Sequence, residues 1–335
     1  IPVQKSLLKT STESEGNNYG PSYNQLDQIN VIAAHGEGYT GTGVRILMLD
    51  TGYYKDHEAI HEEQIIAEWD FINNDGETQN EAGDPDNQHN HGTSVLSIMG
   101  AYVPGTLIGP AFGSEYLLAK TEIVAEEIQQ EEDNYVAALE WGEANGADVV
   151  NSSLGYLDWY SYCDMDGNTA VTTIGVDIAA RLGLACVTSA GNWGNEEPPE
   201  DPCESLSYYI RAPADADSVI AVGAVSADSL IVYFSSRGPS YDGRIKPEVS
   251  ALGVGVAAAN PSGGYSVFYS GTSASSPLVA GVAAVLLSAN PQWTNMEVRE
   301  ALMMTASQAD TPNNDYGYGL VNIWSAIFYN YSGST

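Results

Sequence analysis

The chain has 335 residues, of which 44 are acidic and only 11 basic, so its formal net charge is −33 at pH 7. This charge argues against partners that are themselves anionic, namely nucleic acids and acidic membrane surfaces. The length is sufficient for a large hydrophobic core, and we expect none of the apolar stretches to span a membrane. The first residue is Ile1 rather than an initiator methionine, so we expect a mature, secreted protein.

Apolar runs and helical segments alternate along the chain. The runs at 44–49, 115–119 and 147–151 predict strands, and the segments 135–145 and 170–182 predict helices between and after them. Because the strands contain continuous apolar runs, both of their faces should be covered. The pattern predicts an α/β fold with three layers, in which helices cover both faces of a mostly parallel central sheet.

The chain as a whole is consistent with one domain over residues 1–335. Thr294 and Glu297 have the spacing of a capping box, which predicts a helix that continues to about Ala306. Both ends of the chain are polar and irregular, as terminal segments commonly are. We therefore predict an N-terminal wrapping segment over 1–25, a catalytic core over 26–328 and a C-terminal tail over 329–335.

Two polar residues are predicted at the carboxyl edge of the sheet, where open α/β sheets bind ligands. Asp50 follows the strand at 44–49 and precedes a glycine, and Asn192 follows the apolar run 184–187. Each residue alone is typical of a simple turn. Together they place a carboxylate and an amide at the same edge.

A histidine and a serine stand at predicted helix starts. His91 begins an apolar helical segment, and Ser273 precedes the apolar run 278–287 after a glycine. At this position, the positive end of the helix would stabilise negative charge that develops near the serine hydroxyl. A string of small residues before a core helix also fits capping and close packing, and a lone histidine is usually structural. The combination of Asp50, Asn192, His91 and Ser273 favours nucleophilic catalysis.

The order Asp, His, Ser and the sequence around each residue resemble subtilisin-like serine proteases, the subtilases. The similarity extends from about Tyr23 to Ile327. Four segments carry it: Ile46–Gly52, His91–Val95, Ser189–Asn192 and Gly271–Pro277.

The resemblance implies a serine endopeptidase that needs no cofactor for its chemistry. Ser273 would attack the peptide carbonyl and form an acyl-enzyme, with His91 as the proton acceptor and Asp50 orienting the imidazole. The Asn192 side chain and the Ser273 backbone N–H would form the oxyanion hole. Substrate would bind as an added strand, which favours broad specificity toward proteins and peptides. The family also implies a removed propeptide, and we expect a monomer.

The resemblance further implies a substrate pocket. Its predicted residues are Ser153, Leu154, Gly155 and Tyr156 in one wall, Ser189, Ala190 and Gly191 in the other, and Arg211 near the floor. An arginine there would favour an acidic side chain before the cleaved bond, or it could turn outward into an ion pair. The acidic segment 122–133 would instead favour basic residues farther upstream. The specificity therefore stays open at this point.

Three cysteines permit at most one intrachain disulfide. Cys186 lies in an apolar run and is interpreted as a small buried residue. Cys163 and Cys203 lie in polar, turn-rich segments and would pair in an exported protein, although their spacing does not prove it. By the resemblance, both lie in insertions after the pocket walls.

A structural calcium ion is a further candidate, because subtilases often bind calcium. The oxygen ligands would come from a loop rich in Asp, Asn and Gly. The candidates are Asp70, Asp75, Asp84 and Asp86. Their spacing matches no defined motif, and a solvated acidic loop is the favoured interpretation for any one of them.

Three other interpretations compete with a neutral-to-alkaline protease. A catalytically dead binding module would require loss of a catalytic residue, and none is lost. A peptide ligase on the same scaffold would require exclusion of water from the acyl-enzyme. Ala274 beside the nucleophile also resembles the acid-active sedolisins, but His91 and Asn192 argue against that group. Where many subtilases have an oxidisable methionine, Ala274 predicts resistance to peroxide.

Overall fold

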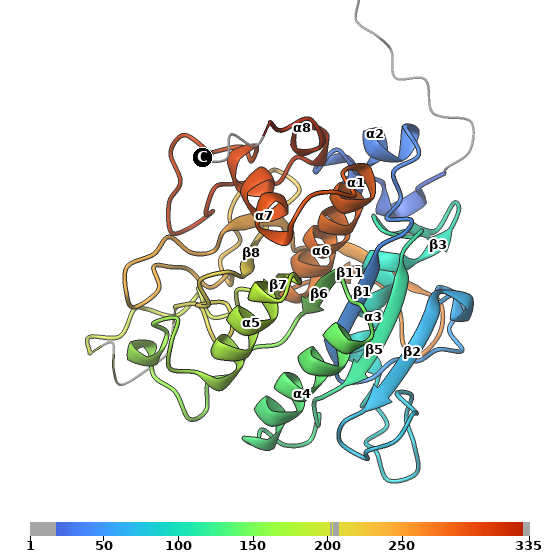
Figure 1. Ribbon diagram of the computed structural model, residues 1–335, viewed down its shortest axis with the longest axis horizontal. Coiled ribbons are helices and arrows are strands. Elements are labelled where there is room, and N and C mark those ends of the chain that lie inside the picture. The colour runs from blue at the N-terminus through green and yellow to red at the C-terminus, as the bar shows by residue number, and fades with distance from the viewer. Residues whose placement is uncertain (1–17, 202, 204–207, 331–335) are drawn as a thin grey trace, which may run out of the picture.

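Seven parallel strands form the central sheet of the computed structural model, which describes residues 18–201, 203 and 208–330 (Figure 1). Their order across the sheet is β2-β5-β1-β6-β7-β8-β9. In chain order they are β1 (Arg45–Asp50), β2 (Ile65–Asp70), β5 (Glu115–Lys120), β6 (Val149–Ser152), β7 (Ala185–Ser189), β8 (Ile220–Val225) and β9 (Val249–Leu252). The predicted strands at 44–49, 115–119 and 147–151 correspond to β1, β5 and β6, and β1 lies between the other two in the sheet.

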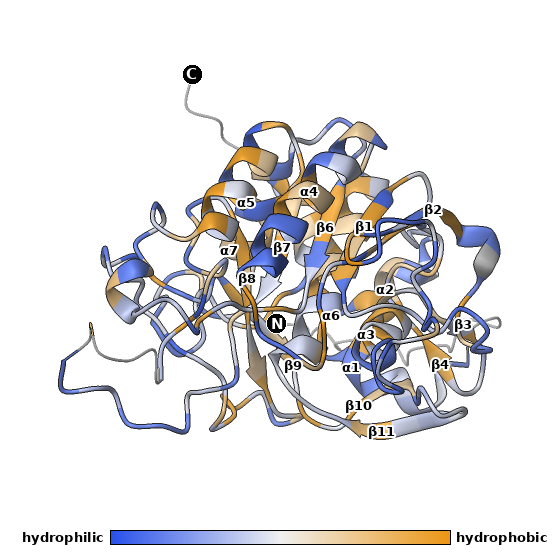
Figure 2. Cartoon of the chain, turned by 90° about the horizontal axis from the view of Figure 1, so that it is seen from below, coloured by the Kyte–Doolittle hydropathy of each residue, from blue (hydrophilic) through white to orange (hydrophobic). Residues whose placement is uncertain are grey.

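Helices cover both faces of this sheet, so the predicted three-layer α/β fold is confirmed. One face packs against α3 (Asn90–Gly100) and α6 (Thr272–Ala289), and the other packs against α4 (Gln130–Ala144) and α5 (Val171–Arg181). Ile46 and Met48 of β1 belong to the first core cluster, whereas Leu47 and Leu49 belong to the second. This alternation is the period of two expected when both faces of a strand are buried. Figure 2 shows α4 and α5 above β1 and β6, and α3 and α6 below these two strands.

Shorter elements complete the structure around these layers. The remaining helices are η1 (Gly20–Ser22), α1 (Tyr23–Asp27), α2 (Val31–Gly36), η2 (Glu62–Gln64), η3 (Tyr162–Asp164), α7 (Asn295–Met304) and α8 (Ile323–Ile327). Two hairpins pair β3 (Tyr102–Val103) with β4 (Leu107–Ile108) and β10 (Val256–Ala259) with β11 (Tyr265–Tyr269). The predicted capping box is present, because the Thr294 side chain accepts from the backbone of Glu297 and the Glu297 carboxylate accepts in return.

The ends of the chain were predicted to wrap or to form a tail. Residues 1–17 and 331–335 lie outside the described residues. Within the rest of the predicted wrapping segment, the Gln25 side chain donates to the Ala257 carbonyl at 3.2 Å and accepts from the Ala257 N–H at 2.8 Å. These bonds attach α1 to β10.

The helix α6 is apolar enough over its length to resemble a membrane span, but 78% of it is buried inside the protein. A helix that is apolar on all sides is typical of a protein core as well as of a membrane. Here α6 crosses the face of the sheet with its N-terminus at the carboxyl edge, where the Ser273 carbonyl accepts a hydrogen bond from Ser153 just after β6. The fold therefore brings α6 to the same edge as the ends of β1, β6 and β7.

Candidate active site

Asp50 and His91 form a hydrogen-bonded pair at the carboxyl edge of the sheet. Asp50 is the last residue of β1 and is fully buried, and His91 is the second residue of α3. The Asp50 Oδ1 atom accepts from His91 Nδ1 at 2.7 Å and from the Thr51 N–H at 2.8 Å. Because an ionised carboxylate only accepts, the proton of the neutral imidazole is on Nδ1. The Nε2 atom is therefore free to accept a proton.

The environment of His91 changes its basicity in two opposing ways. Burial lowers the pKa of the imidazole, but the negative charge of Asp50 and the hydrogen bond to it prevail and raise the pKa above its ordinary value of 6.5. Its side chain remains 33% exposed, so the ring is accessible from solvent. These properties suit a general base that operates near neutral pH.

Ser273 is the second residue of α6 and lies opposite the end of β6. Its hydroxyl donates to the Ser153 carbonyl at 3.2 Å, and the Ser153 hydroxyl donates to the Ser273 carbonyl at 3.2 Å. The His91 ring lies 6.4 Å from the ring of Tyr269, at the end of the strand that leads into α6. In the structure, the Ser273 hydroxyl thus donates to the Ser153 carbonyl rather than to His91. Attack by this hydroxyl therefore requires rotation of the side chain to another staggered rotamer.

Asn192 is held at the start of α6 by Thr272, a residue that the sequence did not single out. The Asn192 Oδ1 atom accepts from the Thr272 N–H at 2.8 Å and from the Thr272 hydroxyl at 3.1 Å. Because a backbone N–H can only donate, this contact determines which end of the amide is oxygen and leaves the NH₂ group free to donate elsewhere. The Ser273 N–H, in the first turn of the helix, has no intrahelical acceptor. Two N–H donors are thus available beside the Ser273 hydroxyl.

The two predicted pocket walls are joined to each other and to α6. The Ser189 hydroxyl donates to the Leu154 carbonyl at 3.3 Å, and the Gly191 N–H donates to the Thr272 hydroxyl at 3.2 Å. Ser189, at the end of β7, is buried, as is Ala190, which follows it. The walls 153–156 and 189–192 therefore meet beside Ser273.

Tyr156 does not border the pocket in the manner that the sequence suggested. Its side chain is buried in the core cluster beneath α4, and its hydroxyl donates to Glu122 at 2.5 Å. Burial is the main cause that raises the pKa of Glu122 well above its ordinary value. The hydrogen bond between Tyr156 and Glu122 therefore supports the pocket wall 153–156 from its buried side.

Arg211 does not turn outward into an ion pair. The residue is only 4% exposed, and no salt bridge joins it to any carboxylate in the described part of the chain. Its guanidinium carbon lies 4.0 Å from the centre of the Trp193 ring. Trp193, which sequence reasoning also missed, follows Asn192 and covers the guanidinium. Stacking on an aromatic ring is a common way to retain a buried guanidinium.

The acidic segment 122–133 is only in part a charged rim. Glu122, Glu131 and Glu132 are buried, and Glu132 accepts from the Trp159 indole at 2.6 Å and from the Tyr160 hydroxyl at 2.9 Å. Their roles are structural because each accepts hydrogen bonds from neighbouring loops or side chains. The exposed acidic residues of this segment are Glu126, Glu127 and Asp133.

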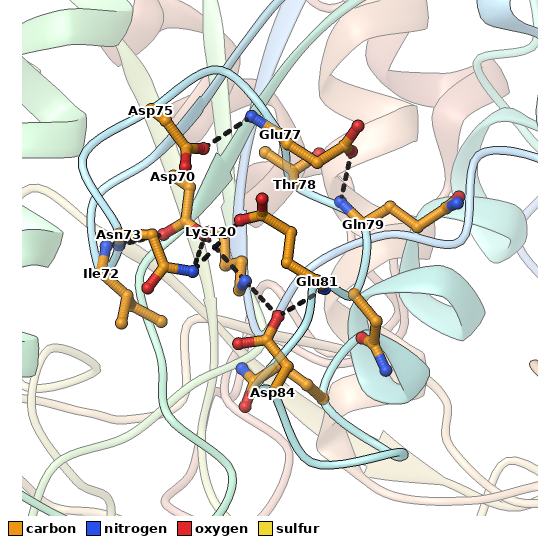
Figure 3. A network of polar contacts seen from close by, with 12 residues as sticks. Asp70, Ile72, Asn73, Asp75, Glu77, Thr78, Gln79, Glu81, Asp84 and Lys120 are labelled. Atoms are coloured by element: carbon orange, nitrogen blue, oxygen red, sulfur yellow. Dashed lines mark hydrogen bonds and ion pairs between the residues drawn. The ribbon is translucent and has the colours of Figure 1, made fainter.

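Two of the four predicted calcium ligands, Asp70 and Asp84, contact a lysine, Lys120 (Figure 3). The fully buried Lys120 ammonium donates to Asp70 and to Asp84, in each case at 2.7 Å. Asp70 Oδ1 also accepts from two backbone N–H groups, and Asp70 Oδ2 accepts from Asn73 at 3.2 Å. The Lys120 ammonium thus supplies the positive charge that these carboxylates require.

The four predicted ligands are not brought together as one set. Asp70 and Asp75 have oxygens within 4.8 Å of each other and of Glu81, which the prediction did not include. Asp84 instead pairs with Lys120, and Asp86 is exposed outside this group. Because internal donors already occupy Asp70 and Asp84, these two carboxylates fit an ammonium better than a calcium ion.

Cys163 and Cys203 form a disulfide, with their Cα atoms 5.0 Å apart. Cys186 is a buried free cysteine, and burial raises its pKa to about 12. The thiol is therefore protonated and inert at neutral pH. The disulfide connects the segments that follow the two pocket walls.

The chain matches the Subtilase family model over residues 41–319. It is 31% identical over 303 residues to the subtilisin of Bacillus pumilus, covering 90% of this chain and 97% of the relative. It is 32% identical over 291 residues to subtilisin DY of Bacillus licheniformis, covering 87% of this chain and 93% of the relative.

Solved structures give the same fold. MycP1 with its N-terminal propeptide removed superposes with a TM-score of 0.72 at 21% identity, over 92% of this chain and 98% of that protein. The prenylagaramide maturation protease PagA superposes with a TM-score of 0.68 at 23% identity, over 89% and 96% of the two chains.

Proposed function

This chain belongs to the subtilase family and is a serine endopeptidase, and we propose that it acts through Asp50, His91 and Ser273 by way of an acyl-enzyme. The observation that carries the proposal is the 2.7 Å bond from His91 Nδ1 to the buried Asp50, at the sheet edge where α6 presents Ser273. That bond leaves Nε2 as the free basic atom.

The reaction begins when the Ser273 hydroxyl rotates away from Ser153. His91 Nε2 takes the hydroxyl proton as the oxygen attacks the carbonyl carbon, and the protonated imidazole then gives that proton to the leaving amine. Asp50 keeps the second imidazole proton on Nδ1 and stabilises the charged ring. A water molecule, activated by the same imidazole, then hydrolyses the ester at Ser273.

The oxyanion forms beside two donors. The Asn192 amide, oriented by Thr272, and the Ser273 N–H would both donate to it, and the positive end of α6 adds to their effect. This stabilisation is greatest when the charge has developed, so it accelerates the chemical step.

The substrate would lie extended between residues 153–155 and the segment after Lys120. Main-chain pairing of this kind does not depend on side chains, so specificity is broad at most substrate positions. The chemistry of the protein requires no cofactor. Its partners are proteins or peptides, and we propose a monomer whose residues 26–328 form the catalytic core of a single domain.

We also place the enzyme outside the cytoplasm, matured by removal of an N-terminal propeptide. The Cys163–Cys203 disulfide and the net charge of −33 are consistent with an extracellular environment. Among the structural neighbours, MycP1 was solved with its propeptide removed, and MycP3 is a protease from a type VII secretion system.

Casein hydrolysis by three proteins tests this function: the wild type, Ser273→Ala and the control Ser270→Ala. Ser270 is exposed and belongs to the same string of small residues. The wild type and the control should hydrolyse casein equally, and Ser273→Ala should retain at most about 10⁻³ of the rate. Hydrolysis by Ser273→Ala at the wild-type rate would exclude this nucleophile.

A further inference from the structure

We propose that Arg211 selects an acidic side chain on the substrate residue whose carbonyl is attacked, so that the enzyme prefers cleavage after glutamate or aspartate. This inference rests on the proposed function, because it requires Ser273 to be the nucleophile.

The position of Arg211 relative to both walls is the first step. A Cβ atom built on Gly155 would lie 3.5 Å from Arg211 Cβ, and one built on Gly191 would lie 3.4 Å from Arg211 Cδ. The arginine side chain therefore runs alongside both walls at once. Ser153, two residues before Gly155, bonds to Ser273, and Gly191 bonds to Thr272. A side chain that enters between these walls from the attacked residue approaches the guanidinium.

The guanidinium lacks a carboxylate partner of its own. Within the described residues, no carboxylate oxygen lies within 4.0 Å of its nitrogens, and the buried Nε atom has no hydrogen-bond acceptor. One face is covered by Trp193 at 4.0 Å. A buried cation with unused donors requires an anionic partner to recover its lost hydration, and the planar fork of arginine matches a carboxylate.

The charge of Arg211 persists under the conditions of proteolysis. Burial lowers its pKa to about 10, while Glu196, Asp158 and Glu127 act in the opposite direction through longer-range attraction. These three carboxylates are the charged groups around it, and they keep the guanidinium protonated at neutral pH without occupying its donors. A substrate carboxylate would complete the pair.

The same geometry disfavours other side chains. A glutamine has the shape of glutamate but carries no charge, so it leaves the buried guanidinium without a counterion. A lysine would place a second positive charge beside it. A charge-assisted contact of this kind corresponds to a difference in kcat/KM of about ten- to a hundredfold.

The test uses the wild-type protein and blocked tetrapeptide p-nitroanilides that differ only in the last residue: Glu, Gln, Leu or Lys. The Glu substrate should exceed the Gln substrate in kcat/KM by about tenfold or more. Equal rates with Glu and Gln would overturn the inference, because the two side chains differ essentially in charge. A higher rate with Leu or Lys than with Glu would overturn it as well.

A pair of variants assigns the preference to the residue. Arg211→Met should reduce the Glu-to-Gln ratio to about one, while Arg237→Met should leave it unchanged. Arg237 is the matched control because its guanidinium also lies over an aromatic ring, that of Tyr208, but is paired with Asp315. A Glu preference that persists in Arg211→Met would overturn the assignment.

Two further measurements distinguish failure of the Arg211 inference from failure of the proposed function. Thermal unfolding and labelling of Ser273 by a fluorophosphonate confirm that each variant is folded with a reactive serine. If the wild type hydrolyses all four substrates without a Glu preference, only the selection by Arg211 fails. If it hydrolyses none and Ser273 is not labelled, the proposed function fails.

Discussion

Asp50 and His91 lie 41 residues apart in the chain, yet the side chains share a 2.7 Å hydrogen bond. The bond places a buried carboxylate against the imidazole atom that does not react with substrate. It therefore controls both the tautomer and the pKa of His91, and the first prediction follows from this.

Asp50→Asn should lower the pKa of His91 to below 6.5, because burial then acts without the opposing charge. An NMR titration of the histidines in the resting enzyme measures this directly. His35, whose pKa burial lowers to about 4, is the internal control and should not change. Turnover should fall about 10⁴-fold. A His91 pKa that is the same in both proteins would contradict the electrostatic role of Asp50.

In the wild type, the acid limb of the kcat/KM profile should have its midpoint above pH 6.5, because His91 must be neutral to accept the Ser273 proton. Rates of peptide hydrolysis between pH 4 and 9 would locate this limb. A midpoint near or below that of an ordinary histidine would show that Asp50 does not raise the basicity of His91.

Asn192→Ala should reduce kcat by about 10² to 10³, the range found when a subtilisin loses such a donor, and leave KM nearly unchanged. The physical reason is that the amide donates to the charged intermediate more strongly than to the neutral carbonyl. Steady-state kinetics with one peptide substrate separate the two constants. Asn195→Ala, at an exposed asparagine three residues later, is the control. Equal effects on kcat and KM would rule out the oxyanion role.

Lys120→Met should destabilise the protein by about 3 to 5 kcal/mol, because Asp70 would remain buried without its cation. Glu115→Gln, which breaks an exposed pair with Arg45, should cost at most about 1 kcal/mol. Urea unfolding of both variants gives the comparison. A chelator should leave the wild-type unfolding midpoint unchanged, since the Lys120 ammonium already occupies oxygens of Asp70 and Asp84. A large decrease in the midpoint on chelation would show that a metal ion stabilises this loop.

Dilute peroxide should leave most of the proteolytic activity intact, because the buried Ala274 beside the nucleophile cannot be oxidised. Met296 and Met304 are exposed on α7, and they should be converted to sulfoxides under the same conditions. Mass analysis and residual activity, measured on the same samples, test both statements. Rapid inactivation at the rate of Met296 oxidation would contradict the prediction.

Much of the fold and the outline of the site were accessible from the sequence, for a physical reason. Parallel strands buried on both faces must be continuously apolar, so β1, β5 and β6 were found close to their true bounds. The carboxyl ends of parallel strands share one edge, which brought Asp50 and Asn192 into one hypothesis. The capping box at Thr294 is a local signal, and it located α7 correctly.

The contacts that sequence reasoning missed are long-range. Lys120 ends an apolar strand and reaches Asp84, 36 residues earlier in the chain, so no local pattern indicates the pair. Glu132 is buried because Trp159 and Tyr160 pack over it. The acidic residues around it in the sequence suggest an exposed position instead. The orientation of Arg211 likewise depends on Trp193, which lies 18 residues earlier and whose exposed ring stacks on the guanidinium.

The central claim is that Ser273 is the nucleophile of this endopeptidase, and covalent labelling with a fluorophosphonate tests it most directly. Peptide mapping should place one phosphonyl group per molecule on Ser273, and casein hydrolysis should fall in proportion to the labelled fraction. Labelling that occurs on another residue, or full hydrolysis by protein whose Ser273 is completely labelled, would contradict the claim.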